Sequence, residues 1–124
     1  MTDVRKTALE VLNKVETDAS FSNLALLHAQ QTLESAKDRA LLSRLVYGVL
    51  ERKMTLDYII EQYARQYAKT KKAVKNVLRL GVYQIYFMDS VPDHAAVHET
   101  VSLLDRCKLA YAKKFVNAVL RSVC

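Results

Sequence analysis

Turn-forming residues are scarce in this sequence, which has two glycines and one proline in 124 residues. An all-β sandwich or barrel needs a turn about every ten residues, and most of those turns depend on glycine or proline. The composition therefore excludes these architectures and predicts an all-α fold. A chain of this length is also typical of one domain, spanning residues 1–124, rather than two.

Cysteines and long apolar segments are also few. Cys107 and Cys124 cannot form a disulfide framework, which favours a reducing, cytoplasmic location. The longest apolar run is 45–50, far short of the ~18 residues that a membrane span requires. The first residues alternate charged with apolar side chains, unlike a secretory signal. We therefore expect a cytoplasmic protein without membrane contact.

Apolar residues recur at helical spacing along the whole chain, and this spacing predicts seven helices. The first covers 3–17, with Thr2 or Asp3 as its N-cap. The second opens at Ser22, with Leu24, Leu27 and Leu33 on its apolar face, and the third follows the capping box at Ser35. The fourth is capped by Thr55, with Tyr63 and Tyr67 on its inner side, and the fifth is capped by Thr70 and ends near Met88. The sixth has Pro92 in its first turn, and the seventh begins at about Tyr111.

Both glycines fall inside predicted helices. Gly48 and Gly81 each cost about 1 kcal/mol relative to alanine there, so we expect each to allow a close approach between helices. The segment 80–88 is apolar almost all round. A helix of that kind belongs in the middle of a bundle.

Acidic residues are absent from 62–88, and this gap accounts for the net charge of +6. Six basic residues lie in it: Arg65, Lys69, Lys71, Lys72, Lys75 and Arg79. On a helix Lys72, Lys75 and Arg79 share one face, opposite the core face. With Tyr63 and Tyr67 nearby, this ridge is suited to a phosphate backbone with stacking bases. The alternatives are a solvated face without a partner and, less favoured, a lipid surface.

Residues with reactive side chains form no recognisable catalytic site. His94 and His98 are four residues apart and could share a metal ion, but no third ligand stands at suitable spacing. Cys107 lies between two basic residues, although an inert thiol is the commoner case. We therefore predict no catalytic residue and no metal ligand in this chain.

Eight motifs follow one another along the chain: Arg5 with Ala8-Leu9-x-Val11-Leu12, Ser22-Asn23-Leu24-Ala25, Asp38-Arg39-Ala40-Leu41, Leu45-Val46-Tyr47-Gly48-Val49-Leu50, Leu56-Asp57-Tyr58-Ile59, Leu78-Arg79-Leu80-Gly81-Val82-Tyr83, Val91-Pro92-x-His94-Ala95-Ala96-Val97-x-Glu99 and Phe115-Val116-Asn117-Ala118-Val119-Leu120. In this order they resemble the NusB-like N-terminal domain of the RsmB (Sun/Fmu) family, the bacterial 16S ribosomal RNA cytosine-5 methyltransferases. The later motifs are shared with the antitermination factor NusB.

The resemblance implies an all-α bundle of about seven helices in two packed helical subdomains, and it implies RNA binding. It also implies a catalytic domain after residue 124, which would bind S-adenosylmethionine. No cofactor is expected within residues 1–124. The family usually has Asn at the position of His98. NusB binds RNA with a basic N-terminal arm, to which Arg5 and Lys6 correspond.

Two functions of the RNA-binding class follow, and one outside it. The first is an accessory domain that positions small-subunit ribosomal RNA for a methyltransferase domain in the same chain. The second is a stand-alone NusB-type antitermination factor that binds RNA with a ribosomal protein. The third is a structural domain that clamps its own enzyme and never touches RNA. The predicted RNA contacts are Arg5, Lys6, Lys72, Lys75, Arg79, Lys113 and Lys114.

Overall fold

The computed structural model describes residues 3–17 and 22–124, and this part of the chain is helical without strands. The elements are α1 (Val4–Thr17), α2 (Ser22–Gln31), α3 (Ala36–Glu51), α4 (Lys53–Glu61), the short 3-10 helix η2 (Tyr67–Lys69), α5 (Lys72–Phe87), α6 (Asp93–Arg106), the short 3-10 helix η3 (Ala110–Ala112) and α7 (Lys113–Val123). The prediction of an all-α fold with seven helices is confirmed for the described residues. None of their helices has the length and apolar character needed to cross a membrane.

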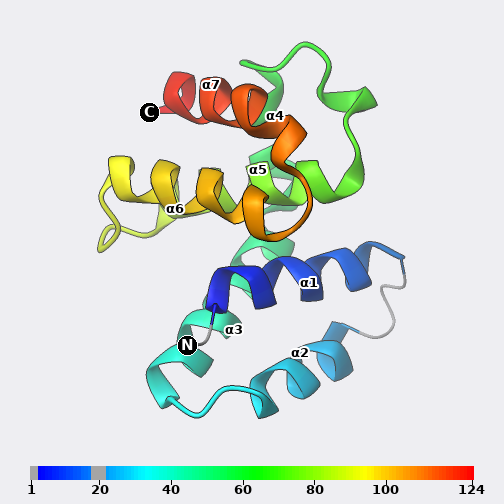
Figure 1. The fold of residues 1–124 in the computed structure, drawn as a ribbon, viewed down its shortest axis with the longest axis vertical. Coiled ribbons are helices and arrows are strands. Elements are labelled where there is room, and N and C mark those ends of the chain that lie inside the picture. The colour runs from blue at the N-terminus through cyan, green and yellow to red at the C-terminus, as the bar shows by residue number, and fades with distance from the viewer. Residues whose placement is uncertain (1–2, 18–21) are drawn as a thin grey trace.

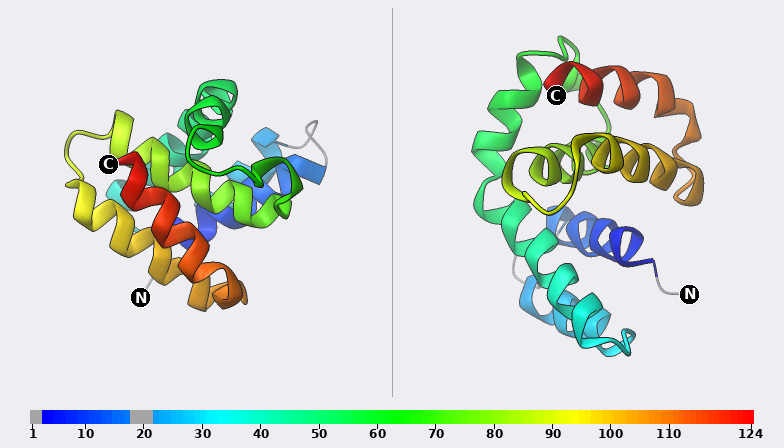
Figure 2. Two further views of the ribbon diagram at one scale, coloured as in Figure 1. Left: turned by 90° about the horizontal axis from the view of Figure 1, so that it is seen from above. Right: turned by 90° about the vertical axis from the view of Figure 1, so that its left-hand side faces the viewer.

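The helices form two subdomains that share one core. Helices α1–α3 make the lower half of the view in Figure 1, and α4–α7 make the upper half. Helix α5 runs through the centre and contacts α1, α3, α4, α6 and α7. Helix α6 lies between α1 and α7 (Figure 2). Every residue of α5 from 76 to 84 is buried, as expected of a helix segment that is apolar on every side.

One buried polar side chain on α5 joins the two subdomains. The Gln84 amide donates to the carbonyl of Leu80 at 3.0 Å and to the Thr100 hydroxyl at 3.3 Å. Its oxygen accepts from Arg5 Nε of α1 at 2.8 Å. Both ends of the buried amide therefore have partners, as burial of a polar group requires.

The two glycines lie at close contacts between helices, as predicted. A Cβ atom added to Gly48 would lie 2.1 Å from Tyr83 Cζ, so only glycine lets α3 approach α5 this closely. At Gly81 the added atom would meet two Leu120 methyl carbons at 2.8 Å, which places α7 against α5. The helix propensity lost at each glycine is the cost of this packing.

Helix starts agree with the sequence where a side chain caps them locally. The Asp3 carboxylate accepts from the Lys6 amide at 3.2 Å, and the Ser35 hydroxyl accepts from the Asp38 amide at 3.4 Å. The predicted caps Thr55 and Thr70 are wrong. Thr55 lies inside α4, because a single residue separates α3 from α4 and the helix begins at once. Thr70 ends η2 instead of capping α5.

Two predicted core faces also differ from the structure. On α2, Leu24 and Leu27 are 47% and 53% exposed, whereas Leu26 is buried against α1 and α3. Leu33 is buried but lies beyond the end of α2. Leucines occur on several sides of this short helix, so spacing could not identify the buried side. Tyr63 was expected inside, but it follows the end of α4 and is 46% exposed.

Candidate nucleic-acid interface

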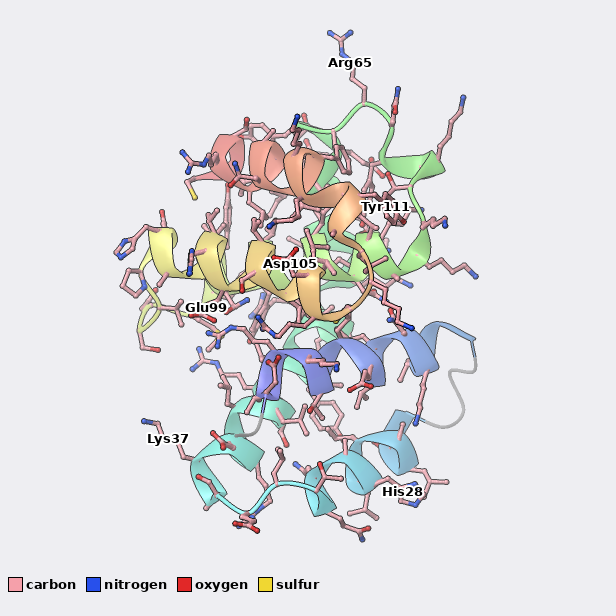
Figure 3. All side chains as sticks on the ribbon, in the orientation of Figure 1. His28, Lys37, Arg65, Glu99, Asp105 and Tyr111 are labelled. Carbon is pink, nitrogen blue, oxygen red and sulfur yellow. The ribbon has the colours of Figure 1, made fainter. Side chains whose placement is uncertain are left out.

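The acid-free segment forms a basic surface around the N-terminal end of α5. We define this basic surface as Arg65, Lys69, Lys71, Lys72 and Lys75. The first four are exposed and Lys75 is half-buried. Arg65 projects from one end of the molecule, above η2 and α7 (Figure 3). Exposed cations gathered on one surface create a local positive potential that attracts polyanions.

A buried tyrosine holds this segment in place. Tyr67, in η2, is 3% exposed and its hydroxyl donates to the Asp57 carboxylate of α4. Burial raises the pKa of Tyr67, and the bond to Asp57 raises it further. Lys75 Nζ lies 5.2 Å from the Tyr67 ring centroid and donates to the Ala68 carbonyl at 3.4 Å. The backbone that carries the exposed cations is therefore anchored to the core.

Arg79 does not belong to the exposed ridge, and its placement there was wrong. It is 5% exposed. Its Nε lies 2.7 Å from Asp57 Oδ1 and its Nη2 lies 3.1 Å from Oδ2, which makes a bidentate ion pair. Its Nη1 donates to Asn76 at 2.8 Å, and Asn76 in turn donates to Asn13 of α1. Helix α4 covers this part of α5, so a position two turns after Lys72 faces a carboxylate instead of solvent.

The remaining predicted contacts are divided between the two ends of the chain. Arg5 and Lys6 lie in the first turn of α1 and are half-buried, and Arg5 is bonded to Gln84. Lys113 of α7 forms an exposed ion pair with Asp105 of α6, with Nζ 2.9 Å from Oδ2. Lys114 is exposed. Lys72 and Lys114 are therefore the exposed cations of the original set.

An exposed tyrosine adjoins the basic surface and was missed by the sequence analysis. Tyr111 in η3 is 66% exposed, and Lys71 Nζ lies 5.5 Å from its ring centroid. A hollow of about 300 Å³ lies between this tyrosine, η2 and the start of α7. The sequence marked Tyr111 only as the start of the last helix. Only the packing of α7 against the acid-free segment brings its ring beside Lys71.

The histidines and cysteines form no metal-binding cluster in the described residues. His94 and His98 are exposed on α6 and line a groove of about 720 Å³ between α6 and α7. Nowhere in the described part of the chain do three potential metal ligands of the His, Cys, Asp or Glu type gather. Partial burial raises the pKa of the Cys107 thiol, although the nearby Lys6 opposes that shift. A raised pKa disfavours the reactive thiolate.

Comparison with known proteins decides the family. The profile of the NusB family matches residues 2–124. The chain belongs to the NusB family. The resemblance to NusB stated from the motifs is therefore confirmed, and the relatives described next confirm the resemblance to RsmB.

Relatives of this NusB family member are of two kinds. The probable ribosomal RNA small subunit methyltransferase B of Bacillus subtilis is 40% identical over 123 residues, which are 98% of this chain and 28% of that protein. The transcription antitermination protein NusB of Bacillus velezensis is 31% identical over 121 residues, which are 96% of this chain and 91% of that protein. The chain thus spans just over a quarter of the methyltransferase relatives it matches.

Two solved structures share the fold. Thermotoga maritima NusB superposes with a TM-score of 0.83 at 21% identity, covering 97% of this chain and 87% of the other. A second, described as antitermination factors NusB and NusE in complex with dsRNA, gives a TM-score of 0.86 at 23% identity and covers 97% and 92%. These likenesses establish the NusB fold of two helical subdomains.

Proposed function

We propose that this domain binds small-subunit ribosomal RNA and positions it for the catalytic domain of a 16S rRNA cytosine-5 methyltransferase. The identity to the methyltransferase relatives supports this choice, since it reaches 40%, against 31% for the NusB protein of Bacillus velezensis. S-adenosylmethionine would belong to that catalytic domain. The two glycines of this chain are packed inside helices and provide no loop for a nucleotide cofactor.

The basic surface is the observation that carries the proposal. Its five cations lie in a segment without an acidic residue, and four of them are exposed. Contacts of this kind neutralise phosphates and release counterions, which favours binding to any RNA of suitable shape. They position the RNA, and they carry little information about its sequence.

The test is the binding of this protein to a labelled single-stranded fragment of small-subunit rRNA across a salt series. Each neutralised phosphate on a single strand contributes about −0.7 to the slope of log affinity against log salt. If at least three of the five cations engage, the slope is about −2 or steeper. We expect Lys72→Glu to weaken binding and to flatten the slope by about 0.7 or more.

The matched control is Lys37→Glu. Lys37 is exposed in the first turn of α3, in the other subdomain, as Lys72 is exposed in the first turn of α5 (Figure 3). Both substitutions change the net charge equally at the start of a helix, so they differ mainly in position. Equal effects of the two variants would reject the basic surface. No binding even at low salt would reject RNA binding and favour the domain that only clamps its enzyme.

The alternative is a stand-alone NusB-type antitermination factor that binds RNA with a ribosomal protein. Its support is that the chain spans 91% of the NusB protein of Bacillus velezensis. The mass of the native protein in cell extract distinguishes the two. A band near 14.1 kDa supports the factor, whereas a much larger protein that carries this domain supports the methyltransferase.

A further inference from the structure

We infer that the seam between η2 and α7 binds the bases of single-stranded RNA, one base against Tyr111 and the next against Tyr63. This inference rests on the proposed function, and it adds base contacts to the phosphate contacts of the basic surface. Two neighbouring hollows carry it, and we call them together the base track.

The first hollow of the base track contains Tyr111. It measures about 300 Å³ and is lined by Gln66, Lys69, Thr70, Lys71, Val74, Tyr111, Ala112 and Phe115. Tyr111 is 66% exposed, Lys71 Nζ lies 5.5 Å from its ring centroid, and Lys69 lines the same hollow. An accessible aromatic face next to cations is the arrangement on which nucleic-acid bases stack, because the ring holds the base while the cations attract its phosphates.

The second hollow lies next to the first. It measures about 330 Å³ and is lined by Tyr63, Ala64, Arg65, Gln66, Phe115, Ala118, Val119 and Ser122. Gln66 and Phe115 line both hollows, so the two are contiguous. Each hollow therefore has its own exposed tyrosine and at least one cation of its own, and Phe115 lines both. This repetition suits consecutive nucleotides of one strand.

Charge selects RNA over an apolar peptide as the occupant. Every charged residue that lines the two hollows is basic, namely Arg65, Lys69 and Lys71. Their segment contains no acid from 62 to 88. Gln66 offers an amide that can donate to and accept from the edge of a base. Stacking tolerates every base, so the base track would show little sequence preference.

The experiment measures the affinity of this protein for labelled oligouridylate by fluorescence anisotropy. We expect Tyr111→Ala to weaken binding at least about fivefold, which is the lower end of the loss typical of removing one stacked base. Tyr111→Phe keeps the ring and should bind like the parent. The control is Tyr58→Ala, because Tyr58 on α4 is equally 66% exposed but lines neither hollow. The same oligouridylate paired with oligoadenylate should bind without sensitivity to Tyr111→Ala.

Salt dependence separates this inference from the proposed function. Tyr111→Ala removes no charge, so it should lower the affinity and leave the salt slope unchanged, whereas Lys72→Glu should flatten the slope. If Tyr111→Ala binds like the parent while Lys72→Glu binds weakly, the phosphate contacts stand and the base track is wrong. In that case the two hollows would bind a protein partner instead of RNA bases. If neither change matters, the proposed function fails as well. Circular dichroism checks that each variant is folded.

Discussion

Removal of Asp57 should strongly destabilise this protein. Asp57 holds the buried guanidinium of Arg79 with two hydrogen bonds and also accepts from the hydroxyl of Tyr67. The Arg79 side chain is only 6% exposed. In Asp57→Ala its charge therefore stays in the interior without this carboxylate. Tyr67 loses the acceptor of a buried hydroxyl at the same time.

The magnitude follows from the depth of the pair. Loss of one partner from a buried ion pair costs about 3–5 kcal/mol. The Asp57 side chain is 25% exposed, and the guanidinium of Arg79 keeps its bond to Asn76. We therefore expect the lower end, about 3 kcal/mol in the free energy of unfolding. For a domain of this size the corresponding decrease in Tm is roughly 10 °C.

The assay is urea denaturation followed by circular dichroism, with a double variant as the decisive comparison. Asp57→Ala combined with Arg79→Met removes the uncompensated charge and fills similar space with an apolar chain. This double variant should therefore be more stable than Asp57→Ala alone by at least about 1 kcal/mol. A loss below about 1 kcal/mol in the single variant, or a double variant no more stable than the single, would refute the reasoning.

Three further predictions concern packing, capping and pH. Gly48→Ala gains about 1 kcal/mol of helix propensity. It should nevertheless lower the free energy of unfolding by about 1–2 kcal/mol overall, because the new methyl group overlaps the Tyr83 ring. A variant that is more stable than the parent in urea would contradict this. Ser35→Ala should cost about 0.5–1 kcal/mol in the same assay, since it removes the cap of α3, and no loss would mean that this exposed bond does not stabilise the helix. Partial burial favours a higher pKa for Asp3, but its bond to Arg106 and that to the Lys6 amide outweigh this effect and hold the pKa below the ordinary 3.8. The pair therefore stabilises the fold above about pH 4 and is lost as the pH falls through the lowered pKa, so unfolding free energies measured from pH 7 to pH 3 should decrease less in Asp3→Asn than in the parent.

Features that depend on neighbours along the chain were predictable from the sequence. The caps at Asp3 and Ser35 need only an acceptor side chain three residues before a backbone amide. The glycines at 48 and 81 stood out because nothing within their own helices explained the lost propensity. The basic segment was visible because a gap in acidic residues needs no structure to be recognised.

Features that depend on a second helix were not predictable. Helical spacing placed Arg79 on the same face as Lys72, but it could not show that α4 lies over only one end of that face. The same limit applies to α2, where Leu26 rather than Leu24 or Leu27 meets the core. Tyr111 joined the candidate interface only because η3 packs beside Lys71.

The sequence by itself determined the all-α class, most helix positions and the excess of positive charge, because composition and periodicity act locally. The tertiary structure alone decided which cations remain in solvent and which is neutralised inside. That decision depends on the 2.7 Å contact between Asp57 and Arg79, residues 22 apart in sequence. A carboxylate at that distance makes burial of the guanidinium tolerable, whereas Lys72 has solvent around it.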